Sequence, residues 1–542
     1  MSDANKPNPA GSGDVPLKQK ADESAAQKSA GSAQPAPAGA APGAVPAPGA
    51  AAPGAPSPAA TPAAAPGAPA AAAPPKPKVP FSPVLTKYIN DPQAYTLAHY
   101  QARGGYETAK AHVGITPPGD LIKLVDESGL RGRGGAGFPT GKKWSFLAKG
   151  TGKPIYLAVN GDESEPGTFK DRYILEADPH QLVEGVILTC YAIGSKHAFI
   201  YLRGEFILGF QRLHAAVQEA KDKGFVGKGI FGTGKGGSPF PDVDLTITVV
   251  RGAGAYICGE ETGMLSSIEG GRGYPKIKPP FPAVSGLFGA PTIVNNVETI
   301  SAVTHIVKHG VAWHKQWGTE KSPGFKIFCL SGSVKKPGVY EVPLGITMRE
   351  MIDQYGGGMK DGRKLKAVIP GGLSAPVLTA EMVDKCTLDY ESLASLGSML
   401  GSGGITVLDE AVDMISTIYN TMRFYHHESC GQCTPCREGT GWLEKVSHRF
   451  HHSEGHQGDI ELLADIAKNM RGRTICVLAD AAAMPMQGFL QHFKKDFEAK
   501  IKETAFVEKQ RTYRDEITPT SKTIMATGAG PSALDVGSNL GS

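Results

Sequence analysis

The sequence of 542 residues contains no long hydrophobic run and no recognisable targeting segment. No stretch of about 18 consecutive apolar residues is present, so we expect no transmembrane helix. Residues 1–10 have neither a basic region nor an apolar stretch, which argues against a secretory signal. The first 30 residues contain no arginine but four acidic side chains, whereas mitochondrial presequences are rich in arginine and poor in acids. These absences predict a soluble protein of a reducing compartment.

Cysteine is scarce as well, with eight residues in the whole chain, and four of these are accounted for by one predicted inorganic site described below. This number is too small for a secreted protein built on disulfides. The other four are scattered and are expected to be small buried residues: Cys190, Cys258, Cys329 and Cys386. Cys258 differs from them because it borders a glycine-rich turn. The net charge of +4, with 20% of residues charged, gives no indication of nucleic-acid binding.

Side chains able to form a core are nearly absent from residues 31–75, where 40 of 45 residues are Ala, Pro or Gly. Such a segment cannot offset the entropy cost of ordering, so residues 1–80 are predicted to be a disordered tail. The rest of the chain is long enough for several domains. We predict folded units at 81–320, 321–410 and 411–515, and a second disordered tail at 516–542.

A cluster of cysteines lies in the sequence Ser-Cys-Gly-Gln-Cys-Thr-Pro-Cys-Arg-Glu-Gly at 429–439. Cys430, Cys433 and Cys436 are close enough to share one inorganic site, and Cys476 can supply a fourth thiolate. Three close cysteines and a remote fourth are typical of a [4Fe–4S] cluster. Structural zinc is the main alternative, although zinc sites usually contain two Cys-x2-Cys pairs, and a disulfide is the other. A cluster would imply electron transfer, and hence an electron donor elsewhere in the chain.

A glycine-rich stretch, Leu-Arg-Gly-Arg-Gly-Gly-Ala-Gly-Phe-Pro-Thr-Gly-Lys-Lys-Trp, occupies residues 130–144. Its match to G-x-G-x-x-G is only formal, because a helix at 117–129 precedes it where a dinucleotide fold would have a strand. The glycines still allow backbone N–H groups to approach an anion, and Arg133, Lys142 and Lys143 add positive charge. The stretch therefore predicts a site for a flat anionic ligand, with a plain flexible loop as the alternative.

Two acidic loops follow predicted strands, at the strand ends where α/β proteins bind ligands. Asn-Gly-Asp-Glu-Ser-Glu-Pro-Gly (160–167) comes after the strand 154–159, and its three acids could hold sugar hydroxyls or a divalent metal. Gly-Ala-Gly-Ala-Tyr-Ile-Cys-Gly-Glu-Glu-Thr (252–262) comes after the strand 244–250. Glu260 there is either a ligand group or a simple charge at a helix start.

Two later segments have groups that suit a nucleotide. Residues 272–281 form a basic and aromatic loop with several prolines. Pro-Thr-Ile-Val-Asn-Asn-Val-Glu-Thr at 291–299 is predicted to begin a helix, and its amides at Asn295 and Asn296 could bind a ring edge.

The last third of the chain predicts two further units. A small α+β unit is expected from strands at 325–331, 338–342, 365–370 and 404–409 and a helix at 347–355. Short connections between later helices predict an antiparallel four-helix bundle, whose end holds the cysteines. The predicted helices are 411–427, 438–452, 458–471 and 479–503.

Taken together, five motifs in this order resemble the NADH-binding, flavin-carrying subunit of respiratory complex I, NADH:quinone oxidoreductase. The resemblance covers about residues 85–510 and rests on GRGGAGF at 132–138, NGDESEPG at 160–167, GAGAYICGEET at 252–262, PTIVNNVET at 291–299 and SCGQCTPCREG at 429–439. It implies an α/β Rossmann-like FMN domain, a β-grasp domain of ubiquitin-like type and a helical iron–sulfur domain. It also implies hydride transfer from NADH to FMN and single-electron transfer to one [4Fe–4S] cluster and on toward quinone.

The resemblance implies a role for individual residues. FMN contacts are expected at Gly132, Arg133, Gly134, Gly135, Lys143, Asn160, Asp162, Glu163, Gly259, Glu260, Asn295 and Asn296. NADH contacts are expected at Phe138, Phe146, Glu165, Glu261, Lys278 and Phe281. The cluster ligands would be Cys430, Cys433, Cys436 and Cys476. No side-chain nucleophile or base is expected, because the cofactor carries the chemistry. Acids near the adenosine ribose predict NADH over NADPH.

The expected partners are a small thioredoxin-like [2Fe–2S] subunit and a large multi-cluster subunit, on the peripheral arm of a complex at the cytoplasmic side of a bacterial inner membrane. The nearest alternative is the homologous diaphorase subunit of an NAD-dependent formate dehydrogenase or NAD-reducing hydrogenase. Many such subunits carry cysteine-rich extensions that this sequence lacks, which favours complex I. A cluster-bearing assembly subunit that has lost its flavin is a second alternative.

Overall fold

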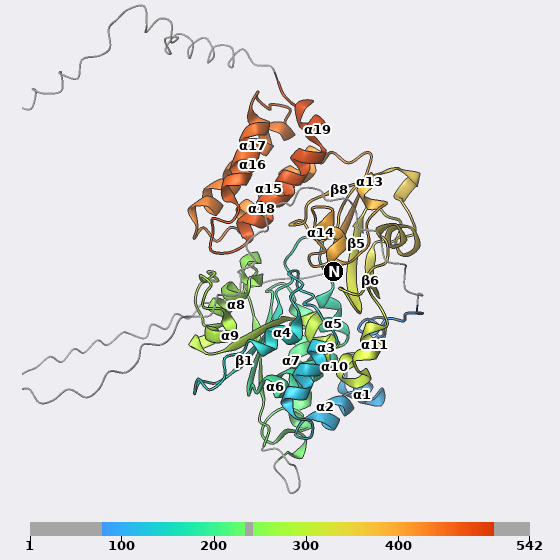
Figure 1. Ribbon diagram of the computed structural model, residues 1–542, viewed down its shortest axis with the longest axis vertical. Helices are drawn as coiled ribbons and strands as arrows, with labels where there is room; N and C mark the ends of the chain where they lie inside the picture. Colours follow the sequence, from blue (N-terminus) through green and yellow to red (C-terminus); the bar gives the residue numbers. More distant parts are fainter. Residues whose placement is uncertain (1–78, 234–241, 503–542) are drawn as a thin grey trace, which may run out of the picture. The chain divides into compact units, whose positions relative to one another are not determined.

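The computed structural model describes residues 79–233 and 242–502 (Figure 1). The two predicted tails, 1–80 and 516–542, therefore lie outside the described residues apart from positions 79 and 80. The described elements comprise a parallel sheet with helices, a second and mixed sheet, and a group of helices near the carboxyl end. Among these residues, no helix combines the length and apolar character needed to cross a membrane.

The first sheet has four parallel strands in the order β3-β2-β1-β4. The strands are β1 (Tyr156–Gly161), β2 (His197–Leu202), β3 (Thr246–Arg251) and β4 (Thr292–Asn296). The chain moves from β1 outward to β2 and β3 and then returns to add β4 on the other side of β1. In open α/β sheets ligands bind beyond the carboxyl ends of the two strands between which the order reverses. Here those strands are β1 and β4, so a ligand is expected in a crevice beyond their carboxyl ends.

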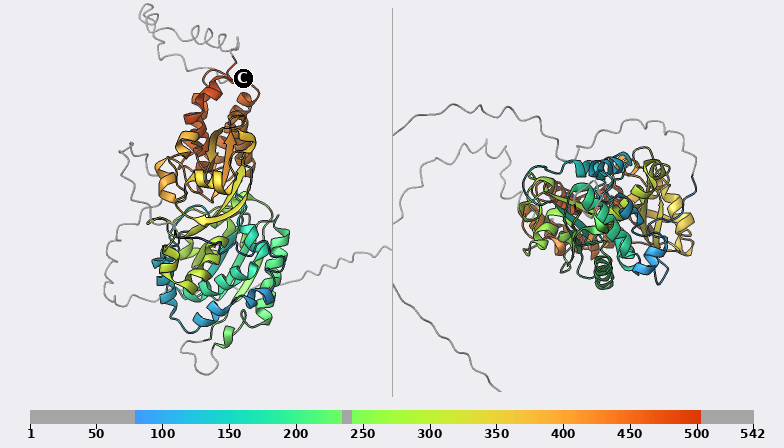
Figure 2. Two further views of the ribbon diagram at one scale, coloured as in Figure 1. Left: turned by 90° about the vertical axis from the view of Figure 1, so that its right-hand side faces the viewer. Right: turned by 90° about the horizontal axis from the view of Figure 1, so that it is seen from below.

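Helices lie on both faces of this sheet (Figure 2). Leu157 and Val159 of β1 belong to one core with the helices α6, α7 and α10, whereas Ala158 points into a different core that contains α8. Such a strand, buried on both faces, is typical of parallel sheets. The helices of this region are α1 (Leu97–Ala102), α2 (Glu107–His112), α3 (Pro118–Glu127), α4 (Thr140–Ser145), α5 (Asp171–Ala177), α6 (Pro179–Ile193), α7 (Ile207–Asp222), α8 (Glu261–Ile268), α9 (Pro282–Ser285), α10 (Val297–His309) and α11 (Val311–Lys315).

The prediction that residues 291–299 begin a helix was wrong for the first half of that segment. Residues Thr292–Asn296 form β4, and α10 begins only at Val297. The β-branched side chains of Thr292, Ile293 and Val294 are buried beside β1, where they fit a strand better than a helix. Asn296 then caps α10, because its side-chain oxygen accepts hydrogen bonds from two backbone N–H groups of the first turn.

Two predicted helices are each divided in the structure. The sequence predicts one helix over 96–112, but this segment forms α1 and α2, separated by Gly104 and by Tyr106, which has a φ of +66°. The segment 479–503 forms α18 (Leu478–His492) and a separate α19 (Lys494–Glu498). In both cases the hydrophobic pattern continues across the residues at which the helix is interrupted, so the spacing of apolar residues alone did not reveal the interruption.

The second sheet is mixed, with the strand order β6-β5-β9-β7-β8. Only β5 and β9 pair in parallel, and the other pairs are antiparallel. Its elements are β5 (Phe325–Gly332), β6 (Gly338–Pro343), α12 (Met348–Glu350), a π-helical turn (Met351–Tyr355), β7 (Leu365–Ile369), β8 (Leu378–Thr379), α13 (Ala380–Val383), α14 (Tyr390–Ser395) and β9 (Gly404–Asp409). The prediction of a small α+β unit is confirmed, although β8, α13 and α14 were too short to be found from the sequence pattern.

Four helices near the carboxyl end pack side by side (Figure 1), and they are α15 (Met414–Glu428), α16 (Thr434–His451), α17 (Asp459–Met470) and α18. Their apolar faces share one core, which includes Met422 of α15, Leu443 of α16 and Leu463 of α17. The same core extends to Ala158 of β1 and Leu265 of α8. The 252–262 turn contacts these helices through Tyr256, whose ring centroid lies 5.1 Å from that of Phe424 in α15.

Candidate functional site

The glycine loop, residues 132–137, connects α3 to α4 and uses its carbonyl groups differently from its N–H groups. Three carbonyl oxygens accept hydrogen bonds from side chains: Gly132 from Tyr390 (2.9 Å), Arg133 from Lys326 (3.3 Å) and Gly137 from Arg131 (2.7 Å). In contrast, the N–H groups of residues 134–137 donate to no acceptor among the described residues. A loop with occupied carbonyls and free N–H groups suits an anionic ligand.

Close packing explains why this loop needs glycine. Gly137 has a φ of +64°, and a Cβ atom there would lie 2.4 Å from the ring of Tyr390. A Cβ atom at Gly134 would lie 3.1 Å from Asn296. A side chain at Gly137 would therefore displace the loop from the protein behind it.

The side chain of Arg133 is buried, with 1% of its surface exposed, and both terminal guanidinium nitrogens have no hydrogen-bond partner within the described residues. Its backbone N–H donates to the hydroxyl of Thr299 at 2.8 Å. Buried guanidinium nitrogens are rarely left without acceptors. These two guanidinium nitrogens can therefore donate hydrogen bonds to a polar ligand bound at this loop.

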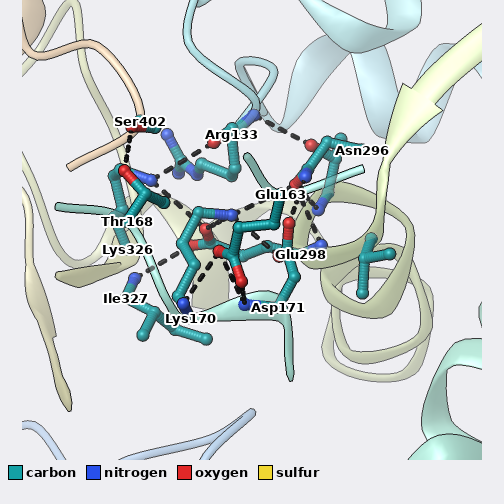
Figure 3. A network of polar contacts seen from close by, with 12 residues as sticks. Arg133, Glu163, Thr168, Lys170, Asp171, Asn296, Glu298, Lys326, Ile327 and Ser402 are labelled. Carbon is teal, nitrogen blue, oxygen red and sulfur yellow. Dashed lines mark hydrogen bonds and ion pairs between the residues drawn. The ribbon is translucent and has the colours of Figure 1, made fainter. Parts of the chain in front are cut away.

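A buried network of charged residues supports the loop (Figure 3). The Nζ atom of Lys170 lies 2.8 Å from carboxylate oxygens of both Asp171 and Glu298, and Lys326 of β5 reaches Glu298 at 3.2 Å. The Asn296 amide donates to Asp171 at 2.6 Å. The network thus joins α5, α10, the end of β4 and the second sheet.

Burial and neighbouring charges shift the protonation of this network in different directions. Burial lowers the pKa of Lys326 to about 8, although Glu298 opposes the shift. Burial alone would raise the pKa of Glu298, but Lys170 and Lys326 lower it below its ordinary value. Burial also raises the pKa of Glu163 to about 7. The network can therefore hold Glu298 charged in a site that excludes water.

The other polar residues predicted at the crevice lie at the ends of β1 and β4, and several are already bound by the protein. Glu163 accepts hydrogen bonds from the N–H groups of residues 170–172 at the start of α5. Asn160 donates to the carbonyl of Gly259 at 2.8 Å, and Asn295 accepts from Trp144 at 2.9 Å. These side chains therefore fix the shape of the crevice.

Asp162 follows the last residue of β1 and accepts a hydrogen bond from Ser164. Burial raises the pKa of this carboxyl to about 7. The Asp162 carboxylate accepts this one hydrogen bond from a side chain, whereas the Glu163 carboxylate is bound by several backbone N–H groups of α5. A carboxyl group whose pKa is shifted to near neutrality is typical of a functional site.

Three phenyl rings predicted to contact NADH are largely exposed: Phe138 (46%), Phe146 (51%) and Phe281 (45%). The rings of Phe138 and Phe146 lie with their centroids 6.1 Å apart. Phe138 and Phe146 thus form a small contiguous apolar patch, and contiguous exposed apolar patches can mark ligand-binding surfaces.

A cluster of opposite charges comes from the same segments. Lys143 and Lys278 lie 3.2 and 3.0 Å from the carboxylate of Glu261, and Lys278 also reaches Glu260 at 3.2 Å. Burial alone would raise the pKa of Glu261, but the two lysines lower it to about 2. Glu260 additionally caps α8 through the N–H groups of its first turn, so both the ligand role and the helix-charge role fit it. Aromatic rings beside fixed charges suit a nucleotide, because the rings can stack on its base and the charged groups can bind its hydroxyls.

The four cysteines of the motif come together from two loops. Cys430 and Cys433 lie between α15 and α16, Cys436 lies in the first turn of α16, and Cys476 precedes α18. All four pack against one apolar core, and no disulfide links cysteines in the described part of the chain. The pKa of Cys476 is raised to about 12, mainly by burial and to a smaller extent by Glu260, Cys436 and Cys430. The side chains that the motif and Cys476 bring together are therefore four thiols.

Four cysteine thiolates can hold structural zinc as well as a [4Fe–4S] cluster, so the type of the donor atoms fits both alternatives.

The cysteine loop adjoins the acidic 252–262 turn. Glu260 is close enough to Cys476 to raise the pKa of its thiol, after the larger effect of burial. The backbone N–H of Tyr256 donates to Glu428, at the end of α15, at 3.0 Å. The predicted flavin side and the predicted cluster are therefore neighbours.

Sequence reasoning missed several residues that build this site. Glu298 lies within the motif at 291–299, and Lys170 follows the motif at 160–167 by three residues. Their charged side chains beside apolar residues in the sequence could have drawn attention to these two positions. Lys326 and Ser374 lie outside all five motifs, and nothing in one sequence indicates that they contact Arg133 and Glu165.

Comparisons with known proteins agree with this arrangement. Residues 125–305 match the family model described as the Nuo51 FMN-binding domain, residues 326–406 match the SLBB domain, and residues 416–500 match the NADH-ubiquinone oxidoreductase-F iron-sulfur binding region. In a solved structure of an NAD+-reducing [NiFe]-hydrogenase in the air-oxidized state, one chain is 34% identical with a TM-score of 0.66, and the match covers 76% of this chain and 68% of that one.

Curated relatives are more similar in sequence. The second F subunit of NADH-quinone oxidoreductase in Rhizobium meliloti is 49% identical over 423 residues, covering 78% of this chain and 98% of the relative. The F subunit of Streptomyces coelicolor is 49% identical over 425 residues (78% and 92%), and that of Mycobacterium tuberculosis H37Rv is 50% identical over 428 residues (78% and 94%). These matches confirm the resemblance drawn from the five motifs. The chain belongs to the family of NADH-quinone oxidoreductase F subunits.

Proposed function

We propose that this chain is the electron-input subunit of an NADH-quinone oxidoreductase. It oxidises NADH with FMN and passes electrons singly to a [4Fe–4S] cluster and on toward quinone. The observation that carries the proposal is the direct contact between the predicted flavin and cluster sides: the backbone N–H of Tyr256, in the 252–262 turn, donates at 3.0 Å to Glu428, two residues before Cys430. The names of the relatives and the matches to an FMN-binding domain and an iron–sulfur region support it.

The glycine loop and the ends of β1 and β4 hold FMN in this proposal. When bound, FMN accepts a hydride from NADH and releases electrons one at a time. The free N–H groups of residues 134–137 and the Lys143 ammonium balance the phosphate. The remaining contacts come from Gly132, Arg133, Gly134, Gly135, Asn160, Asp162, Glu163, Gly259, Glu260, Asn295 and Asn296.

NADH binds against the exposed rings of Phe138, Phe146 and Phe281 in this proposal, with Lys278 and Glu165 completing its pocket. The carboxylate of Glu261 stays charged at neutral pH because two lysines lower its pKa. A fixed negative charge beside the adenosine ribose repels a 2′-phosphate, which favours NADH over NADPH.

Cys430, Cys433, Cys436 and Cys476 hold the cluster as thiolates in this proposal. Their Sγ atoms lie in a largely apolar setting, where Ser429 approaches Cys436 at 3.2 Å and the N–H of Ile475 donates to Cys433 at 3.4 Å. Hydrogen bonds to cluster sulfurs and the exclusion of water tune the reduction potential of such centres.

We further propose the finer fold assignment implied by the resemblance. It comprises a Rossmann-like FMN domain at 81–320, a β-grasp domain at 321–410 and a four-helix iron–sulfur bundle at 411–515. The reversal of strand order beside β1 supports the first, the mixed sheet around parallel β5 and β9 supports the second, and the packing of α15 to α18 supports the third.

The partners proposed are the small thioredoxin-like [2Fe–2S] subunit and the large multi-cluster subunit of such a complex, at the cytoplasmic side of a bacterial inner membrane. The alternative is the diaphorase subunit of an NAD-reducing hydrogenase, which the solved structure favours at 34% identity. The identity of 49–50% to the F subunits of several bacteria favours the quinone-linked complex. The partner that co-purifies with the chain distinguishes the two.

The test is an ultraviolet–visible spectrum of the anaerobically purified chain before and after NADH. We expect flavin peaks over a broad iron–sulfur absorbance, bleached by NADH and hardly by NADPH. A colourless protein that takes up neither FMN nor iron under conditions that preserve clusters would overturn the proposal.

A further inference from the structure

Ser374 lies in the loop between β7 and β8 and makes two hydrogen bonds to one carboxylate oxygen of Glu165. Its backbone N–H donates to Oε1 at 2.8 Å, and its hydroxyl donates to the same atom at 2.7 Å. The Tyr256 hydroxyl donates to the other oxygen, Oε2, at 2.7 Å. Both oxygens of Glu165 are therefore bound by residues from other parts of the chain, and Ser374 comes from the second sheet region.

The loop that carries Ser374 is shaped around Glu165. Gly372 has a φ of +94°, and a Cβ atom there would lie 2.5 Å from Cγ and 2.6 Å from Oε1 of Glu165. The N–H of Leu373 donates to the carbonyl of Pro166 at 3.2 Å. A glycine is required for the approach, and a backbone hydrogen bond fixes the register, so the contact is specific in its geometry.

The electrostatic setting makes these donors important. Burial raises the pKa of Glu165, and the hydrogen bonds from Ser374 and Tyr256 oppose that shift. Among the described residues no lysine, arginine or histidine pairs with this carboxylate, and the titratable groups that face it are the phenols of Tyr256 and Tyr425. The charged form of Glu165 therefore depends on neutral donors rather than on a cation.

We propose that Ser374 is a positioning residue for the NADH site, which orients Glu165 and favours its charged form from the second sheet region. This inference rests on the proposed contact between Glu165 and NADH. It means that the SLBB domain contributes to the donor site itself.

The test is the Ser374→Ala variant of the full chain in its complex, assayed with NADH and an artificial electron acceptor. Removal of one hydrogen bond to a charged group should lower kcat/KM for NADH about tenfold, mainly through KM. Because the hydroxyl favours the carboxylate, its loss should also raise the pH at which kcat/KM falls on the acid side, by up to about one unit. The dissociation constant of NAD+, measured by equilibrium titration, should rise in parallel.

The matched control is Ser402→Ala. Ser402 is also a buried serine of the second sheet region, and its hydroxyl bonds Thr168 across the same boundary (Figure 3) without touching Glu165. It should leave KM, the NAD+ affinity and the acid limb unchanged. Ser374→Thr retains a hydroxyl and should restore most of the lost affinity. Tyr256→Phe removes the donor to Oε2 and should move the acid limb in the same direction as Ser374→Ala.

Glu165→Gln separates failure of this inference from failure of the proposed NADH site. If Glu165→Gln leaves KM and the pH profile unchanged, Glu165 does not contact NADH, and the role of Ser374 fails with it. If Glu165→Gln alters both but Ser374→Ala behaves like Ser402→Ala, only the positioning role of Ser374 is overturned.

Discussion

The two proposed cofactor sites are supported by opposite kinds of chemistry. Behind the glycine loop, six charged side chains are buried within one another's reach: Arg133, Glu163, Lys170, Asp171, Glu298 and Lys326. Around the four cysteines, the neighbours are mostly apolar side chains of a single core. Buried opposite charges that compensate one another thus stabilise the flavin side, whereas the sulfur ligands and apolar packing stabilise the cluster side. The two sides should respond to different substitutions.

The largest expected effect is loss of the cluster in Cys476→Ala. This thiol comes from a loop separate from the other three, and its removal leaves only three of the four Cys thiolates that hold a [4Fe–4S] cluster. We expect iron content and the reduced-cluster electron paramagnetic resonance signal to disappear while FMN remains bound. Cys386→Ala, which removes a buried thiol of the second sheet region, should retain the signal. An intact signal in Cys476→Ala would show that the fourth ligand lies elsewhere.

Removal of one charge from the network on the flavin side should have the next largest effect. Lys170→Met leaves Asp171 and Glu298 with less compensation in a buried site, which typically costs about 3–5 kcal/mol. We expect the free energy of unfolding in urea to fall by that amount, and FMN to dissociate more readily. In contrast, Lys276→Met breaks an exposed pair with Glu269 and should cost about 0–1 kcal/mol. If the free energy of unfolding of Lys170→Met falls by less than about 1 kcal/mol, the idea that charge compensation stabilises the flavin side is contradicted.

The same contrast explains how much could be read from the sequence. The proximity of the cysteines proposed as ligands was predictable for three of them, because these lie within seven residues of the sequence. The strands β1, β3 and β9 were found within a few residues for a similar reason, since local pattern decides them. The pairing of Lys326 with Glu298, 28 residues apart, and of Ser374 with Glu165, 209 residues apart, depends on the tertiary fold. β4 was missed because its buried β-branched residues run directly into a capped helix.

A smaller effect is expected on coenzyme choice. Glu261→Gln removes the fixed negative charge beside Lys278, so this lysine of the proposed NADH pocket becomes free to attract a 2′-phosphate. We expect the ratio of kcat/KM for NADPH to that for NADH to rise about tenfold. Glu269→Gln, at the other end of α8, is the control and should leave the ratio unchanged. An unchanged ratio in Glu261→Gln would exclude this residue from coenzyme selection.

The smallest effect concerns acid stability, and it tests whether the charge cluster at Glu261 also stabilises the fold. The two lysines hold the pKa of this carboxyl at about 2, below its ordinary value of 4.5. A lowered pKa in the folded state adds stability that is fully present above pH 4.5 and is lost as the pH falls toward 2. Since all three side chains are about one-quarter exposed, screening should keep the contribution below about 2 kcal/mol. The unfolding free energies of the wild type and Glu261→Gln, measured in urea at several pH values, should therefore differ most above pH 4.5 and converge toward pH 2. A constant difference across that range would mean that the ion pairs serve coenzyme binding and contribute nothing to folding.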